Sequence, residues 1–103
     1  MSQSKQTPLS KTQIKFLRSK AHNLKPVVMI GDKGLTENVL EEINLALNHH
    51  ELIKIKVRAE EREDKKAIIE AICKETKGQE VQVIGHILAL YRRSDDVKII
   101  LPK

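Results

Sequence analysis

Apolar residues recur at two different spacings along this chain, and together they predict alternating helices and strands. Helical spacing occurs in three segments: 11–22, 37–50 and a third that starts in the charged run 60–66 and ends near residue 77. β-Branched runs or strict alternation occur in four shorter segments: 27–30, 52–58, 81–84 and 87–92. The order α-β-α-β-α-β-β predicts an α/β fold of compact two-layer type, with a four-stranded mixed sheet and helices packed on it.

The first predicted helix has two distinct faces. Ser10 and Gln13 have the spacing of a capping box, which marks the helix start. Ile14, Leu17 and Ala21 form an apolar stripe at helical spacing, which predicts contact with the core. A second stripe contains no acid and is basic throughout: Lys11, Lys15, Arg18 and His22. This stripe is either a solvated face or a surface that contacts a polyanion.

A G-x-x-G turn, Gly31-Asp32-Lys33-Gly34, lies between the first predicted strand and the helix that begins after Thr36. Glycines let the backbone turn tightly and approach a ligand closely. The first N–H groups of a helix attract phosphate, and Lys33 adds a full positive charge nearby. The motif is too short for a Walker A loop and lacks the third glycine of a dinucleotide fingerprint. It indicates either a phosphate-cradling loop or an ordinary tight turn.

Residues 52–58 alternate between apolar and basic side chains, which predicts a strand with one face in the core. The basic members are Lys54, Lys56 and Arg58. They would form a second basic surface unless the first helix covers that face of the sheet. Farther along, Gly78 is expected to end the third helix in the left-handed conformation, and Gly85-His86 fits a type II′ hairpin turn. Residues 97–101 predict a further edge strand.

The charge of the chain is unevenly distributed. The formal net charge is +5. Residues 1–34 contain seven Lys and Arg and one acid, whereas residues 35–103 contain twelve Lys and Arg and thirteen acids. The excess positive charge therefore lies in the N-terminal third, which predicts a polyanionic partner, either nucleic acid or an acidic protein surface.

Length and composition narrow the class of protein. The 103 residues are expected to form a single domain over 9–103, preceded by a disordered polar tail at 1–8. No Trp, one Phe and one Tyr are present, so the core must be aliphatic, and an aromatic platform for stacking bases is not expected. Cys73 is the single cysteine and lies in an apolar run typical of a buried position. The absence of an apolar leader or a long apolar run favours a cytoplasmic protein without membrane contact.

Motifs of catalysis and metal binding are absent from the sequence. No G-x-S-x-G, H-E-x-x-H or C-x-x-C pattern occurs. His49 and His50 are adjacent, so they do not share a helix face, and no further ligand stands at a metal spacing. We therefore expect no enzyme activity, no cofactor and no metal.

Three segments, in the right order, resemble the signature of the CRM domain family in its stand-alone bacterial, YhbY-like form: 24–36, 49–57 and 81–92. The similarity extends from about residue 9 to Pro102. The resemblance implies a fold similar to the C-terminal domain of bacterial translation initiation factor three. It also implies RNA binding and, for the bacterial members, association with precursors of the large ribosomal subunit. Related domains occur in plant organellar splicing factors.

The family's G-x-x-G loop corresponds to Gly31, Asp32, Lys33 and Gly34, and the resemblance implies that it contacts the RNA backbone. An acid at Asp32 departs from an ideal phosphate cradle and could instead cap the turn. We therefore predict a monomeric, non-enzymatic RNA-binding protein that associates with large-subunit ribosomal RNA. The predicted contacts beyond the loop are Lys11, Lys15, Arg18, Lys25, Lys54, Lys56 and Arg58. Two alternatives stay open: a module that docks on acidic ribosomal proteins without direct RNA contact, and a small enzyme with a phosphate-bearing ligand.

Overall fold

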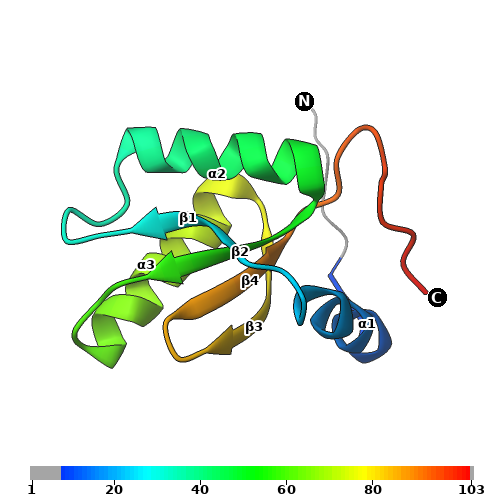
Figure 1. The fold of residues 1–103 in the computed structure, drawn as a ribbon, viewed down its shortest axis with the longest axis horizontal. Helices are drawn as coiled ribbons and strands as arrows, with labels where there is room; N and C mark the ends of the chain where they lie inside the picture. The colour runs from blue at the N-terminus through cyan, green and yellow to red at the C-terminus, as the bar shows by residue number, and fades with distance from the viewer. Residues whose placement is uncertain (1–7, 103) are drawn as a thin grey trace.

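The computed structural model describes residues 8–102, and its elements follow the predicted order (Figure 1). The helices of this range are α1 (Lys11–Ala21), α2 (Glu37–His50) and α3 (Arg62–Thr76). Its strands are β1 (Pro26–Ile30), β2 (Leu52–Val57), β3 (Gln79–Ile84) and β4 (Ile87–Tyr91). The predicted α/β class with a four-stranded mixed sheet is confirmed. The tail predicted at 1–8 lies, apart from Pro8, outside the described residues.

The described strands form a mixed sheet in the order β1-β2-β4-β3. β1 and β2 are parallel, whereas β4 is antiparallel to both β2 and β3. A parallel pair needs a crossover connection, which α2 supplies. α2 and α3 pack on one face of the sheet, above and behind it in Figure 1, and enclose an aliphatic core. Its buried members are Val28, Ile30, Ile43, Leu47, Ile53, Ile55, Val57, Ile69, Ile72, Leu88 and Leu90.

The opposite face of the sheet is covered in part, by α1 and by the segment that follows β4 (Figure 1). The predicted apolar stripe of α1 packs there, with Leu17 and Ala21 buried against Leu52, Ala89 and Tyr91. Lys54 and Lys56 project from the same face because their neighbours along β2 point into the core. α1 therefore covers the end of this face at Leu52 and leaves the other end open.

Hydrogen bonds at the start of α1 cap the helix and join it to the C-terminal segment. The capping box is present as predicted: Gln13 N–H donates to Ser10 Oγ at 3.2 Å, and Ser10 N–H donates to Gln13 Oε1 at 3.0 Å. Gln13 Nε2 also donates to the Pro102 carbonyl at 3.0 Å, which joins the end of the chain to the start of α1. Ile99 and Leu101 pack against the same apolar cluster as α1.

A buried carboxylate holds the segment after β4. Glu51 is 0% exposed and accepts hydrogen bonds from Ser94 N–H and Ser94 Oγ at 2.8 Å, Lys98 N–H at 2.9 Å and Ile99 N–H at 2.7 Å. Burial by itself raises the pKa of the Glu51 carboxyl, but these hydrogen bonds outweigh burial and lower the pKa below its ordinary value. The edge strand predicted at 97–101 is wrong, because a carboxylate rather than a neighbouring strand satisfies these N–H groups.

Two glycines flank β3: Gly78 precedes the strand and Gly85 follows it, and each is needed for a different reason. Lys77, not Gly78, adopts the left-handed conformation after α3, with φ 64°, so the predicted position was wrong by one residue. Gly78 is needed for space, because a Cβ there would lie 3.0 Å from Leu90 Cδ1. Gly85 and His86 join β3 to β4, and of the two only Gly85 has a positive φ, as a type II′ turn requires.

We predict that Glu51→Gln lowers the free energy of unfolding at pH 7 by about 2–4 kcal/mol, because an amide turns a donor toward buried N–H groups that need an acceptor. The measurement is urea unfolding followed by circular dichroism. Glu41→Gln, an exposed change on α2, the helix that ends just before Glu51, serves as the matched control and should leave the midpoint unchanged. Equal midpoints for the wild-type protein and Glu51→Gln would show that the carboxylate does not stabilise the fold.

The same pair of proteins yields a pH test. An unfolded Glu titrates at about pH 4.3, and the folded-state pKa of Glu51 is lower, so the ionised carboxylate stabilises the fold above that pH. This contribution is lost as the pH falls through the folded pKa. The stability difference between wild-type protein and Glu51→Gln should therefore be largest near neutral pH and narrow below about pH 4.

Candidate nucleic-acid interface

The G-x-x-G segment forms the predicted tight turn between β1 and α2. Gly34 N–H donates to the Gly31 carbonyl at 3.0 Å, which closes the turn and leaves Asp32 and Lys33 exposed at its tip. Thr36 caps α2 as predicted, its Oγ1 accepting from the Val39 N–H at 3.2 Å. Within the described residues the Asp32 side chain makes no hydrogen bond, so it does not cap the turn.

The two glycines of this turn differ in what the fold requires of them. Gly34 has φ 74°, a left-handed conformation that a residue with a Cβ adopts at a cost. Gly31 has no positive φ, and a Cβ at this position would meet nothing within 4 Å. Backbone conformation therefore explains the glycine at position 34, whereas neither conformation nor packing within the chain explains the glycine at position 31. A residue without a side chain at Gly31 keeps the backbone open to a close approach from outside.

Hydrogen bonds join three connections at one edge of the sheet. Arg58 N–H donates to the Ile30 carbonyl at 3.0 Å, which links the chain after β2 to the end of β1. Val57 N–H donates to the His86 carbonyl at 2.7 Å, and Lys65 Nζ donates to the Gly85 carbonyl at 2.7 Å. These bonds hold the 31–34 turn, the connection from β2 to α3 and the β3–β4 turn around one groove.

This edge groove has a volume of about 1090 Å³ and walls of opposite charge. One wall consists of Gly31, Asp32 and Gly34 of the turn together with Lys56 and Arg58, so that its two cations outnumber its single acid. The other wall is the start of α3 and the residues before it, where Glu60, Glu61 and Asp64 lie. Acids at the N-terminal end of a helix offset the positive end of its dipole. An anion in the groove is therefore attracted to the wall with the turn and repelled from α3.

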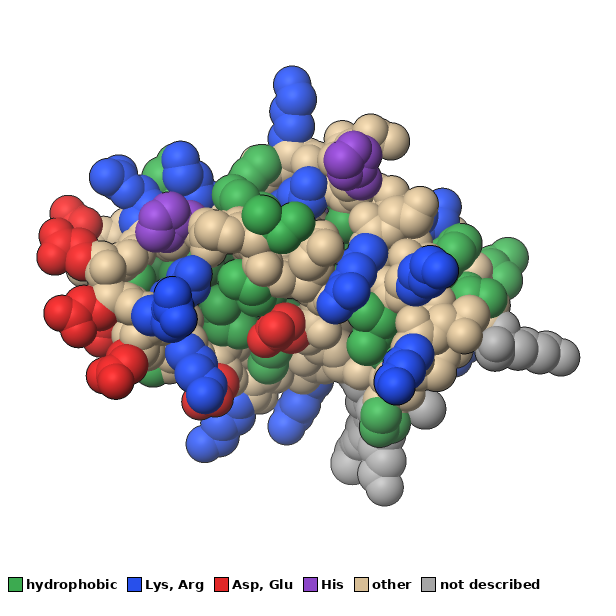
Figure 2. Space-filling model, turned by 90° about the horizontal axis from the view of Figure 1, so that it is seen from below, with side chains coloured by type: hydrophobic (Ala, Val, Ile, Leu, Met, Phe, Trp, Pro, Cys, Tyr) green, Lys and Arg blue, Asp and Glu red, His purple; other side chains and the backbone are tan. Residues whose placement is uncertain are grey.

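The remaining predicted contacts lie on the α1 side of the molecule. Lys11, Lys15 and Arg18 are exposed along α1, and Lys25 is exposed in the connection to β1. Arg18 Nε also donates to the Val81 carbonyl at 3.3 Å, which holds its side chain against the edge strand β3. Figure 2 shows Lys and Arg side chains spread over this side of the molecule, whereas Asp and Glu gather mainly at its left end.

The three predicted basic residues of the second strand, Lys54, Lys56 and Arg58, differ in exposure. Lys54 is half-buried, whereas Lys56 and Arg58 are exposed and share the edge groove with the 31–34 turn. The first helix thus covers one end of this face and leaves the basic residues near the turn accessible. The predicted residues accordingly fall into two groups, one around the turn and one along α1 and Lys25, with Lys54 between them.

Sequence reasoning missed the exposed apolar residues beside these cations. Met29 is 56% exposed and Ile84 is 63% exposed. The run 27–30 is wholly apolar, which is typical of a strand buried on both faces, so the sequence contains no signal that Met29 faces solvent. Figure 2 shows hydrophobic side chains exposed among Lys and Arg near the middle of the molecule.

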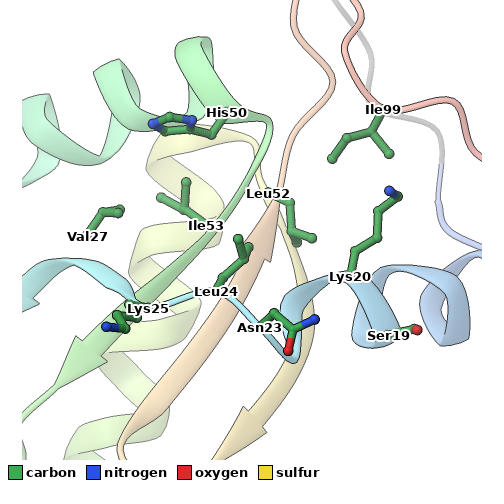
Figure 3. Close-up of a pocket in the computed structure, with 10 residues that line it drawn as sticks. All are labelled: Ser19, Lys20, Asn23, Leu24, Lys25, Val27, His50, Leu52, Ile53 and Ile99. Carbon is green, nitrogen blue, oxygen red and sulfur yellow. The ribbon is translucent and has the colours of Figure 1, made fainter.

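A second hollow, of about 730 Å³, lies between the end of α1, the connection to β1 and the segment after β4. Figure 3 shows Leu24 and Leu52 within it, Lys20 on the α1 side and His50 at the end of α2. Ile99 borders it from the C-terminal segment. Lys25 lines this hollow rather than the edge groove, so it is separate from the turn.

Some polar groups serve the fold and lie outside the candidate interface. Arg92 donates to Asn44 Oδ1 and Asn48 Oδ1 at 2.8 Å and to the Thr76 carbonyl at 2.7 Å, which ties α2 to the end of α3. Burial raises the pKa of the Cys73 thiol, and the nearby Glu80 and Glu70 raise it further. Among residues 8–102, no group of three or more His, Cys, Asp or Glu is placed to hold a metal ion. No helix in this range is long and apolar enough to cross a membrane.

Comparison with known proteins gives the class of this chain. The model of the CRS1 / YhbY (CRM) domain matches residues 9–92. The chain belongs to this family, and the predicted resemblance is confirmed. A protein of Haemophilus influenzae named RNA-binding protein is 60% identical over 97 residues, which cover 94% of this chain and 98% of the relative.

Relatives from other bacteria extend the match. The protein of Bacillus subtilis named Probable RNA-binding protein YqeI is 41% identical over 90 residues, covering 87% of this chain and 94% of the relative. The solution structure of the hypothetical protein SAV1595 from Staphylococcus aureus, for which RNA binding is suggested, has a TM-score of 0.81 at 40% identity. That match covers 92% of this chain and all of the solved chain, so the fold is shared over nearly the whole length.

The geometry of the turn leads to a test with two matched variants. We predict that Gly34→Ala lowers the free energy of unfolding by about 1–2 kcal/mol, because alanine disfavours a φ of 74°. Gly31→Ala should leave stability within about 0.5 kcal/mol of the wild-type value, since it meets no atom and needs no positive φ. Urea unfolding of both variants measures the difference. Equal losses would show that the turn has a different conformation in solution.

Proposed function

We propose that this protein binds RNA without catalysing a reaction, and that the 31–34 turn contacts the RNA backbone. The observation that carries the proposal is the turn itself: a glycine that the fold does not require, Gly31, beside an exposed cation, Lys33. Lys56 and Arg58 stand on the same wall of the groove. The RNA-binding names of several family members support this proposal.

The basic residues of α1 and of the connection to β1 extend the proposed surface. Lys11, Lys15, Arg18 and Lys25 are exposed and would neutralise further phosphates. Contacts of this kind give affinity that falls steeply with salt and little information about base sequence. Structured RNA suits such a surface better than DNA, because α1 packs its apolar face on the sheet and presents its basic face to solvent as a charged stripe rather than as a set of base-reading side chains.

The finer part of the proposal concerns the RNA. The family resemblance implies association with precursors of the large ribosomal subunit, and we propose this role in ribosome assembly for the present chain. In this proposal residues 9–103 act as a single domain, as a monomer and in the cytoplasm. The competing function, docking on acidic ribosomal proteins, would use the same basic stripe of α1 but would not need the 31–34 turn.

We predict that Lys33→Glu leaves folding intact and weakens RNA binding by roughly three- to tenfold near physiological salt, because one phosphate contact is lost and a repulsive charge is added. The slope of log affinity against log salt concentration should become shallower by about one, as expected for the loss of one phosphate contact. The measurement is fluorescence anisotropy with a labelled ribosomal RNA fragment at several salt concentrations.

Lys74→Glu is the matched control, because Lys74 is exposed near the end of α3 that lies away from the groove and the change in net charge is the same. It should weaken binding much less than Lys33→Glu. Equal affinity of wild-type protein and Lys33→Glu would remove Lys33 from the interface. Equal weakening by both variants would mean that net charge, rather than the turn, determines binding.

Crosslinking in cells tests the ribosomal role. We expect ultraviolet crosslinking followed by sequencing to recover mainly large-subunit ribosomal RNA. Reads spread over messenger or transfer RNA would keep RNA binding and reject the ribosomal role. A protein partner that stays bound after ribonuclease treatment, with no RNA above background and no salt-dependent RNA binding in vitro, would favour the docking function.

A further inference from the structure

A single row of residues crosses the open end of the sheet on the α1 side. Strand pairing places Met29 of β1 opposite Lys56 of β2, Lys56 opposite Ile87 of β4, and Ile87 opposite Ile84 of β3. Paired residues on neighbouring strands point to the same face. At a strand spacing of about 4.8 Å, the row is roughly 14 Å long. Three of its four side chains are apolar, and Met29 and Ile84 are more than half exposed.

The packing of α1 explains why this row is uncovered. The cluster under α1 includes Leu52, Ala89 and Tyr91, which occupy the rows farther from the turn. Ile87 is two residues from Ala89 along β4 and does not belong to that cluster. An exposed apolar row on a sheet that is otherwise covered by helices is a feature of interaction surfaces.

The position of the row relative to the turn favours nucleic acid as its partner. Met29 precedes Gly31 by two residues, so the row lies about 7 Å from the proposed phosphate contact along β1. Lys56 belongs both to the row and to the basic wall of the groove. On the other wall, Glu60, Glu61 and Asp64 repel phosphates. A chain held at the turn is therefore directed away from α3 and over the open sheet.

We propose that this row, Met29-Lys56-Ile87-Ile84, binds unpaired bases of the RNA whose backbone the 31–34 turn holds. The inference rests on the proposed function and adds the class of RNA: a loop or single strand rather than a continuous duplex. Four-stranded sheets of other RNA-binding domains stack bases on aromatic side chains. Here aliphatic groups and the Met29 thioether form the apolar surface in place of aromatic rings. Thioethers contact aromatic rings favourably, so the Met29 side chain suits contact with a base. Lys56 in the middle of the row pairs with the adjacent phosphate.

Methyl resonances of methionine test the contact directly. The chain contains two methionines, Met1 and Met29, so methyl-labelled protein gives two signals, and Met29→Leu identifies the one from Met29. We expect an RNA hairpin with an unpaired loop to shift the Met29 methyl signal upfield, as a group over the face of a base does. A fully paired RNA duplex with the same number of phosphates should bind without this shift.

Affinity measurements test the same surface with a matched control. The double variant Met29→Ala/Ile84→Ala should bind the hairpin roughly two- to tenfold more weakly, with unchanged affinity for the duplex and an unchanged salt slope. Leu45→Ala is the control: Leu45 is 55% exposed, close to the 56% of Met29, but it lies on α2, across the sheet from the row. It should alter neither affinity. Both substituted positions are exposed, so urea unfolding should show that all variants stay folded.

The outcomes separate this inference from the proposed function. If wild-type protein and the double variant bind hairpin and duplex alike, and the Met29 methyl signal does not move, RNA binding stands and the base contact is rejected. If neither RNA is bound, the proposed function itself fails, and if Lys33→Glu has no effect, Lys33 is removed from the interface. If the double variant loses a ribonuclease-resistant protein partner while its RNA affinities are unchanged, the row is a protein-docking surface and the inference is overturned.

Discussion

The parallel pairing of β1 and β2 determines where the charged residues of this protein meet. Carboxyl ends of parallel strands lie at the same edge of a sheet, and the pair needs a crossover helix on one face. α2 is that crossover, so the turn that precedes it and the chain that follows β2 leave from the same edge. The hydrogen bond from Arg58 N–H to the Ile30 carbonyl joins these two connections. In an antiparallel pair, Lys33 and Arg58 would stand at opposite ends of the sheet.

The two faces of the sheet differ in how completely they are covered. The face under α2 and α3 holds the aliphatic core, and its fully buried residues supply most of the apolar burial that stabilises the fold. The other face is covered at one end by α1 and by the C-terminal segment, which Glu51 fixes through four hydrogen bonds. Apolar burial on the α2 and α3 face and under α1 therefore stabilises the fold, so the open end of the other face can present cations and apolar groups to solvent.

Features that depend on neighbouring residues in the chain could be predicted from the sequence. The capping box of Ser10 and Gln13, the Thr36 cap and the Gly85 hairpin turn are local, because each hydrogen bond or φ angle involves residues a few positions apart. Element order follows from spacing alone, and the family resemblance was carried by three contiguous segments. The 31–34 turn was predicted for the same reason, although its binding role stays a prediction.

Features that depend on distant contacts could not be predicted. The C-terminal residues 97–101 look like a strand, but their N–H groups bond to a carboxylate at Glu51, more than forty residues earlier. Gly78 was expected to supply a left-handed conformation. Instead, a glycine is needed at this position because a Cβ there would crowd the side chain of Leu90 on β4. The meeting of Lys56 with the turn follows from strand pairing, and the exposure of Met29 follows from how far α1 extends over the sheet.

Charge alone would not give such a protein a defined orientation on RNA. Contacts to phosphates supply affinity, yet every phosphate is alike, so a uniformly basic surface binds in many registers. In the proposed binding mode, two asymmetries of this structure would restrict those registers. The acids at the start of α3 face the basic wall across one groove, which gives a bound backbone a preferred side. The row that includes Met29 lies on that preferred side, where, as we propose, it would offer bases an apolar surface. The proposed orientation thus depends on where acids and apolar groups interrupt the positive charge.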